Sequence, residues 1–310
     1  MSSLIVETNQ LTKEFKRMKV VNRINLSIEK GEIYGFLGPN GAGKTTTIRM
    51  LLGLAQPTSG SIKLFNQGPE QHLKARRKIG SLVESPSYYG HLTGRENLEA
   101  LRKILQVPTS RIDEVLQIVK LTKDANRAVK GYSLGMKQRL GIAASMLGNP
   151  ELLILDEPTN GLDPAGIQEI RTLIKEMPTQ YGMTVLVSSH LLSEIDQMAT
   201  KVGIITKGNM IFQDSIDVLR KKATSRLLLT VNEPDRAKRL LLSKGVVTDR
   251  QKQQLSMEYI DHAQVAKIVS FLVSEQIDMY RIEEQKTSLE HIFLELTKEE
   301  EEKDVSSTAS

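Results

Sequence analysis

The chain has 310 residues, more than one average hydrophobic core accommodates, so its length predicts two domains. Hydrophobic residues make up 39% and charged residues 25% of the sequence, which excludes a disordered chain and is typical of a globular protein. The net charge of +5 leaves an anionic membrane face, nucleic acid and plain solubility open as explanations. The lack of cysteine excludes thiol catalysis and disulfides, and neither an export signal nor a spanning segment of roughly 18 apolar residues is predicted.

A strand, a loop and a helix are predicted near the start of the chain. Glu32 to Leu37 is a short apolar run that predicts a strand, and GPNGAGKT, Gly38 to Thr45, follows it. After this loop Ile48, Leu51 and Leu52 recur at helical spacing.

The loop GPNGAGKT has the spacing of a phosphate-binding loop. Its glycines permit close approach of the backbone N–H groups and the helix start to phosphate oxygens. Lys44 adds positive charge at the β- and γ-phosphates, and Thr45 can place its hydroxyl on Mg²⁺. The ATP-binding residues predicted here are Gly38, Pro39, Asn40, Gly41, Ala42, Gly43, Lys44, Thr45 and Thr46.

Two helices are predicted within a helical subdomain at about residues 90–150. Thr93 and Glu96 have the spacing of a capping box, the leucines that follow have helical spacing, and Pro108 ends the helix. Ser110 then opens a second helix with its own apolar face.

Two apolar runs, Leu152 to Glu157 and Thr184 to His190, predict strands that are covered on both faces. Their alternation with helices predicts a parallel sheet and an α/β fold. Asp156 and Glu157 end the first strand, at the sheet edge where such folds bind ligands. Asp156 is expected in the shell of Mg²⁺ and Glu157 beside the attacking water; an acidic strand end without chemistry is the alternative, which the phosphate loop disfavours.

The pattern of predicted secondary structure changes after about residue 223. Strands near residues 226–231, Val246, Leu255 and Met279 and helices over 234–244 and 262–275 predict a small α+β sandwich. This accessory domain is expected over residues 223–298, with a last helix around Leu289 to Leu296. The acidic tail at 299–310 has too little apolar content to fold and is expected to be disordered.

Three further motifs make the order of residues resemble the ATPase subunits of ABC transporters over residues 1 to about 222. YSLGMKQRLGIA, Tyr132 to Ala143, resembles the ABC signature, NGLDP, Asn160 to Pro164, resembles the D-loop, and His190 matches the switch histidine. The resemblance implies a P-loop NTPase fold with a helical subdomain, in which His190 contacts the γ-phosphate and orients Glu157.

The same resemblance implies further binding residues. Phe15 stands where the family stacks an aromatic ring on adenine, although an ordinary core or surface phenylalanine remains an alternative. In the family the signature and D-loop face the ATP of the opposing subunit. The residues that correspond here are Ser133, Leu134, Gly135 and Asp163.

The sequence departs from the family pattern at three positions. Leu134 replaces the second signature glycine and Met136 the glutamine. Glu84 stands where the family places the Q-loop glutamine, which puts Mg²⁺ ligation by Thr45, Asp156 and Glu84, and the link to the membrane subunit, in doubt. This substitution and the context of His190 are similar to the branch that exports bacitracin and lantibiotics.

The combined prediction is an ATP hydrolase, with Lys44, Glu157 and His190 as catalytic residues, that drives a separately encoded membrane permease. By the resemblance it binds ATP and Mg²⁺ and lies in the cytoplasm against the inner face of the bacterial membrane. A homodimer is expected, and pairing with a related ATPase subunit is the alternative. Another export system is one alternative. A nucleic-acid-associated ABC protein is disfavoured because the chain has one cassette without a long coiled-coil insertion. A regulator that does not hydrolyse ATP is disfavoured because Asp156 and the catalytic residues are present.

Overall fold

The computed structural model describes residues 3–16, 18–83, 87–221, 225–258 and 261–286. The chain divides into two compact units, Met1–Ile216 and Asp217–Ser310. Helix α8, Ile216–Lys221, begins at this division. The domain boundary expected from the sequence, after residue 222, falls among residues 222–224, outside the described ranges.

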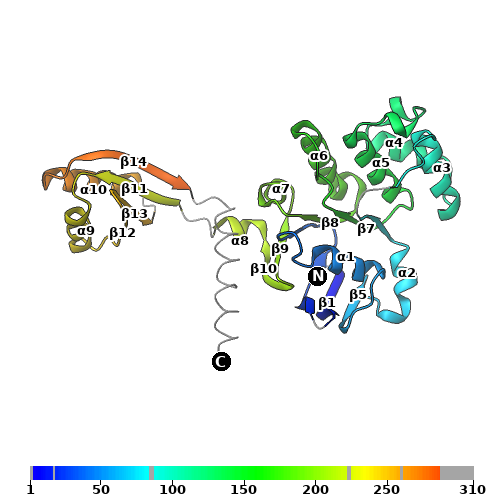
Figure 1. Ribbon diagram of the computed structural model, residues 1–310, viewed down its shortest axis with the longest axis horizontal. Helices are drawn as coiled ribbons and strands as arrows, with labels where there is room; N and C mark the ends of the chain where they lie inside the picture. Colours follow the sequence, from blue (N-terminus) through cyan, green and yellow to red (C-terminus); the bar gives the residue numbers. More distant parts are fainter. Residues whose placement is uncertain (1–2, 17, 84–86, 222–224, 259–260, 287–310) are drawn as a thin grey trace. The chain divides into compact units, whose positions relative to one another are not determined.

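A six-stranded sheet forms the centre of the first unit (Figure 1), in the order β10-β9-β4-β8-β7-β6. Its strands pair in parallel except for β10, which is antiparallel to β9. All residues of β4, β7 and β8 are buried, as their uninterrupted apolar runs predict. The strands are β4 (Ile33–Leu37), β6 (Ile79–Leu82), β7 (Leu152–Asp156), β8 (Thr184–Ser189), β9 (Lys201–Thr206) and β10 (Asn209–Ser215).

Helices lie on both faces of this sheet. Tyr34 and Phe36 of β4 share a buried cluster with Ile48 of α1 (Lys44–Leu52). A Cβ atom at Gly35 would lie 2.4 Å from Ile195 of α7 (Leu192–Asp196), on the opposite face. The long helix α6 (Pro164–Tyr181) contacts β4 and β8. The predicted α/β architecture with a parallel sheet is confirmed.

An antiparallel sheet covers the α1 side of the same core. Strand β1 (Leu4–Phe15) pairs with β2 (Met18–Ile24), β3 (Ser27–Glu29) and β5 (Ser59–Leu64). Its apolar side chains, such as Val6 and Ile28, join the cluster that contains Ile48. This packing places the loop between β4 and α1 beside β2, where it forms the rim of the site described below.

The helical segment contains α3 (Gly94–Leu105), α4 (Ser110–Ile118) and α5 (Leu134–Met146), with α2 (His72–Arg76) before it. Thr93 caps α3 and forms the predicted capping box with Glu96, since each residue's side chain accepts a hydrogen bond from the other's backbone N–H. Gln106 ends α3 in the left-handed conformation, two residues before Pro108. No helix among the residues that the structure describes is both long and apolar enough to cross a membrane.

The second unit has the order β-α-β-β-α-β and a four-stranded antiparallel sheet, β12-β13-β11-β14, a split βαβ arrangement. Two helices cover one face, where Leu227, Leu229, Leu255 and Leu272 are buried together. The elements are β11 (Ser225–Val231), α9 (Pro234–Ser243), β12 (Asp249–Gln251), β13 (Gln254–Glu258), α10 (His262–Ser274) and β14 (Met279–Lys286).

One expected strand is displaced. The prediction of a strand near Val246 is wrong, because Gly245 adopts a left-handed conformation (φ 78°) and the Val246 N–H donates to Leu241 O, which closes the end of α9. Strand β12 therefore begins at Asp249. The last predicted helix and the acidic tail lie at residues 287–310, outside the described residues.

Candidate nucleotide-binding and catalytic site

The phosphate loop leads from β4 directly into α1. Gly43 precedes the helix with a φ of 109°, and a Cβ atom there would lie 2.6 Å from Val20 O, so only glycine fits the turn. Lys44 is 5% exposed, and its Nζ donates to the carbonyl oxygens of Gly38 at 2.7 Å and Pro39 at 3.2 Å. The ammonium group is therefore held inside the loop, where a phosphate group could exchange for these carbonyls.

Thr45 and Asp156 bring two oxygen ligands together at the start of α1. The Thr45 hydroxyl donates to Asp156 Oδ2 at 2.8 Å, across 111 positions of sequence. The other carboxylate oxygen, Asp156 Oδ1, accepts from the Ser188 hydroxyl. A hydroxyl beside a carboxylate fits the preference of Mg²⁺ for oxygen ligands, so the residues present suit the predicted metal.

Glu157 lies at the end of β7 in a left-handed backbone conformation, with φ at 48°. Its N–H donates to Ser188 Oγ at 2.9 Å, so Ser188 bonds both acidic residues. A left-handed backbone conformation is uncommon for a residue other than glycine and persists only where the surrounding structure fixes it. Such residues occur preferentially at functional sites. This turn directs the Glu157 carboxylate between two cationic or ionisable side chains.

The carboxylate of Glu157 approaches both Lys44 and His190. Oε1 lies 3.3 Å from Lys44 Nζ, and Oε2 lies 3.3 Å from His190 Nδ1. His190 Nδ1 is buried but makes no hydrogen bond among the described residues, so the contact has ion-pair distance without hydrogen-bond geometry. The fold thus gathers a lysine, a carboxylate and an imidazole beside the phosphate loop.

An open hollow lies over the phosphate loop and includes Glu157 in its wall; it is lined by Val20, Asn40, Gly41, Gly43, Lys44, Thr45, Thr46 and Glu157. Phe15, at the end of β1, does not line this hollow. Phe15 is 49% exposed, and its ring centroid lies 4.9 Å from Lys13 Nζ. Stacking of Phe15 on adenine remains a prediction.

The signature and D-loop segments each contain a helix N-cap. Ser133 caps α5 by accepting from Met136 N at 3.2 Å, and Asp163 caps α6 by accepting from Gly166 N at 2.9 Å. Leu134 is 53% exposed, and a Cβ atom on Gly161 would lie 3.3 Å from its Cδ2. The leucine that departs from the family pattern thus lies against the D-loop, while the trans contacts of Ser133, Leu134, Gly135 and Asp163 remain predictions.

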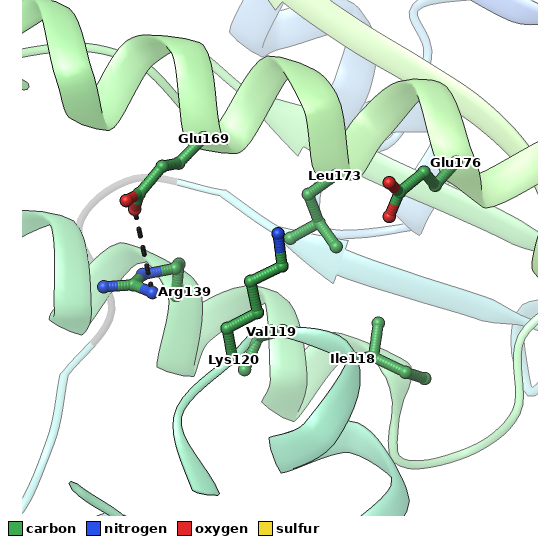
Figure 2. A pocket seen from close by; sticks show the side chains of 7 residues that line it. All are labelled: Ile118, Val119, Lys120, Arg139, Glu169, Leu173 and Glu176. Atoms are coloured by element: carbon green, nitrogen blue, oxygen red, sulfur yellow. Dashed lines mark ion pairs between the residues drawn. The ribbon is translucent and has the colours of Figure 1, made fainter. Parts of the chain in front are cut away.

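A pocket lies between α5, α6 and the end of α4 (Figure 2). Arg139 of α5 faces Glu169 of α6 at 3.7 Å, and Lys120 and Glu176 line the same pocket. Arg139 Nε is buried without a hydrogen-bond partner among the described residues. Charged groups therefore join the helix that begins at the signature to the helix that begins at the D-loop.

Sequence reasoning missed two residues of the site. Ser188 bonds Asp156 and Glu157, and the Glu194 carboxylate accepts hydrogen bonds from residues beside the predicted catalytic positions. The serine pair before His190 is visible in the sequence, but nothing local shows which carboxylate it meets. Glu84, the expected Q-loop position, lies outside the described residues.

The known proteins that this chain resembles are ATP-binding proteins of ABC transporters. The ABC transporter family profile matches residues 21–160. The bacitracin transport ATP-binding protein BcrA of Bacillus licheniformis is 44% identical over 298 residues, covering 95% of this chain and 97% of BcrA. The lantibiotic transport ATP-binding protein SrtF of Streptococcus pyogenes is 44% identical over 213 residues, covering 69% of this chain and 92% of SrtF. The dimeric post-hydrolysis structure of the ATP-binding cassette MJ0796, bound to ADP and Pi, superposes with a TM-score of 0.61 at 26% identity over 68% of this chain and 98% of that one.

Proposed function

The chain belongs to the ATP-binding proteins of ABC transporters, and on this premise we propose that it powers the export of a peptide antibiotic through a separate membrane permease. The family membership makes it an ATP hydrolase. The substrate class rests on relatives named for bacitracin and lantibiotic transport, which share 44% of their aligned residues with this chain. The observation that carries the catalytic proposal is the convergence of Lys44, Glu157 and His190.

Each of these side chains has a role that its position supports. Backbone N–H groups at the start of α1 and the Lys44 ammonium bind the phosphates. Glu157 accepts the proton of the attacking water while oxygen–phosphorus bond cleavage releases ADP and phosphate. His190, whose Nδ1 lies 3.3 Å from Glu157 Oε2, orients this carboxylate and contacts the γ-phosphate.

Thr45 and Asp156 are the residues that would hold Mg²⁺, since their oxygens already meet at 2.8 Å. The ion supplies charge neutralisation at the phosphate oxygens when it is bound. Glu84 is a further proposed oxygen ligand from the sequence.

The active form that we propose is a homodimer on the inner membrane face. Two copies enclose two ATP molecules, with the exposed helix starts at Ser133 and Asp163 of one copy facing the phosphate loop of the other. The dimeric MJ0796 cassette, which resembles the first unit, supports this arrangement. Glu84, at the Q-loop position of the sequence, is the proposed link to the permease.

The test is survival of cells that express the chain together with its permease under challenge with bacitracin and with a lantibiotic. Protection that disappears with Glu157→Gln, at equal expression of both subunits, is the expected result. Wild-type ATP hydrolysis without protection from either compound would leave the chain an ABC ATPase of another export system. Absence of phosphate release by the purified chain with its permease would refute the catalytic assignment itself.

A further inference from the structure

Glu194 is a buried carboxylate for which the proposed chemistry has no use. It lies on α7 with only 7% of its surface exposed. Burial of a carboxylate is costly unless hydrogen bonds compensate for the lost water. The position of Glu194 is therefore informative through the partners that offset this cost.

Both residues that donate to the Glu194 carboxylate adjoin the proposed catalytic positions. The Thr159 and Ser189 hydroxyls each donate to Glu194 Oε2 at 2.8 Å. Thr159 stands two residues after Glu157, and Ser189 stands directly before His190. One carboxylate oxygen thus joins the loop after β7 to the end of β8.

Ser189 extends this connection in two directions. Its hydroxyl accepts from Leu191 N at 3.0 Å, so the turn on either side of His190 closes on the Glu194 network. Its backbone oxygen accepts from Gly38 N at 3.3 Å, at the first residue of the phosphate loop. The network therefore joins the phosphate loop, the loop after β7 and the end of β8, which lead to Lys44, Glu157 and His190 respectively.

We propose that Glu194 is a positioning residue for ATP hydrolysis, which holds the His190 turn against the Glu157 turn through Ser189 and Thr159. The distance that it sets is the 3.3 Å between His190 Nδ1 and Glu157 Oε2. This contact has no hydrogen bond of its own at His190 Nδ1, and Glu157 occupies an uncommon backbone conformation, so an external tie between the turns is needed. The proposal rests on the roles proposed above for Glu157 and His190.

Charge and geometry determine which substitutions test this role. Glu194→Gln keeps a carbonyl oxygen that can accept from both hydroxyls but loses the strength that the charge adds. Glu194→Ala removes both hydrogen bonds, and Thr159→Val removes one of them at nearly constant volume. Ser193→Ala, at an exposed position of the same helix, is the matched control.

The experiment measures kcat and KM for ATP, nucleotide binding and thermal unfolding of the full chain with its permease. We expect Glu194→Ala to lower kcat at least tenfold per folded molecule with KM within about twofold of the wild type. Glu194→Gln and Thr159→Val should fall between Glu194→Ala and the wild type, and Ser193→Ala should match the wild type. If Glu194→Ala changes the unfolding temperature but leaves kcat per folded molecule unchanged, the role of Glu194 is structural only and the proposal is overturned.

A double substitution separates this inference from the catalytic assignment. In a His190→Ala background Glu194→Gln should lower kcat by less than twofold further, because the group that it positions is gone. Full additivity of the two substitutions would show that Glu194 does not act through His190. If Glu157→Gln and His190→Ala leave kcat unchanged, the proposed function fails; if they lower it and Glu194→Ala does not, only this inference fails.

Discussion

Replacement of Glu157 by glutamine removes one charge from the centre of the site at constant shape. The Glu157 side chain is 23% exposed, and its two oxygens each lie 3.3 Å from a neighbour, Lys44 Nζ on one side and His190 Nδ1 on the other. Glutamine fits the same space and offers an oxygen to Lys44, but its amide cannot accept the proton of the attacking water. The fold and the phosphate loop should survive while the chemical step fails.

The size of the effect follows from this loss of a general base. A positioned base contributes on the order of 10²–10⁴ in rate, or about 3–5 kcal/mol in barrier height. Nucleotide affinity should change little, because the loop amides, the Lys44 ammonium and the Thr45–Asp156 pair remain in place. We therefore expect Glu157→Gln to bind ATP like the wild type and to release phosphate at least a hundredfold more slowly.

The assay is phosphate release at saturating ATP together with nucleotide binding by the same preparation. Glu151→Gln is the control, since Glu151 precedes the same strand and pairs with the exposed Lys78 at 2.8 Å, away from the phosphate loop. Its rate should equal that of the wild type. A Glu157→Gln rate within about twofold of the wild type, about 0.4 kcal/mol, would show that another group activates the water.

Three further predictions concern the loop, the domain division and the Q-loop position. Gly43→Ala should abolish nucleotide binding in a folded protein, because its Cβ atom would meet Val20 O at 2.6 Å and the φ of 109° disfavours alanine; unchanged ATP affinity in a binding titration would contradict this. Residues 1–222 alone should fold and bind Mg·ATP, since every nucleotide motif precedes this boundary; circular dichroism and the same titration would expose a truncation that is unfolded or does not bind nucleotide. Glu84→Ala should lower antibiotic survival more than basal ATP hydrolysis, with Glu84→Gln intermediate, and wild-type survival with Glu84→Ala at matched expression would make Glu84 an ordinary surface residue.

Local pattern and motif spacing determined much of this protein. The apolar run of β7, the helical spacing after the phosphate loop and the capping box at Thr93 each depend on residues close in sequence, and the structure confirms these elements. The same local logic failed after α9, where the left-handed Gly245 and the bond from Val246 N to Leu241 O close the helix end at the position expected for a strand. A turn of this kind depends on a backbone angle that the apolar pattern does not report.

Tertiary structure alone decided which distant residues meet. Thr45 bonds Asp156 across 111 positions, and Thr159 bonds Glu194 across 35. Local helical or strand periodicity cannot predict contacts between residues so far apart in sequence. The motifs of the sequence identify Lys44, Glu157 and His190 as candidates for one reaction, but only the order of β4, β8 and β7 in the sheet brings their loops to one edge. Glu194 carries no motif. Its contact with Ser189 is local, but its contact with Thr159 depends on that strand order, because neighbouring parallel strands align the segments that follow them.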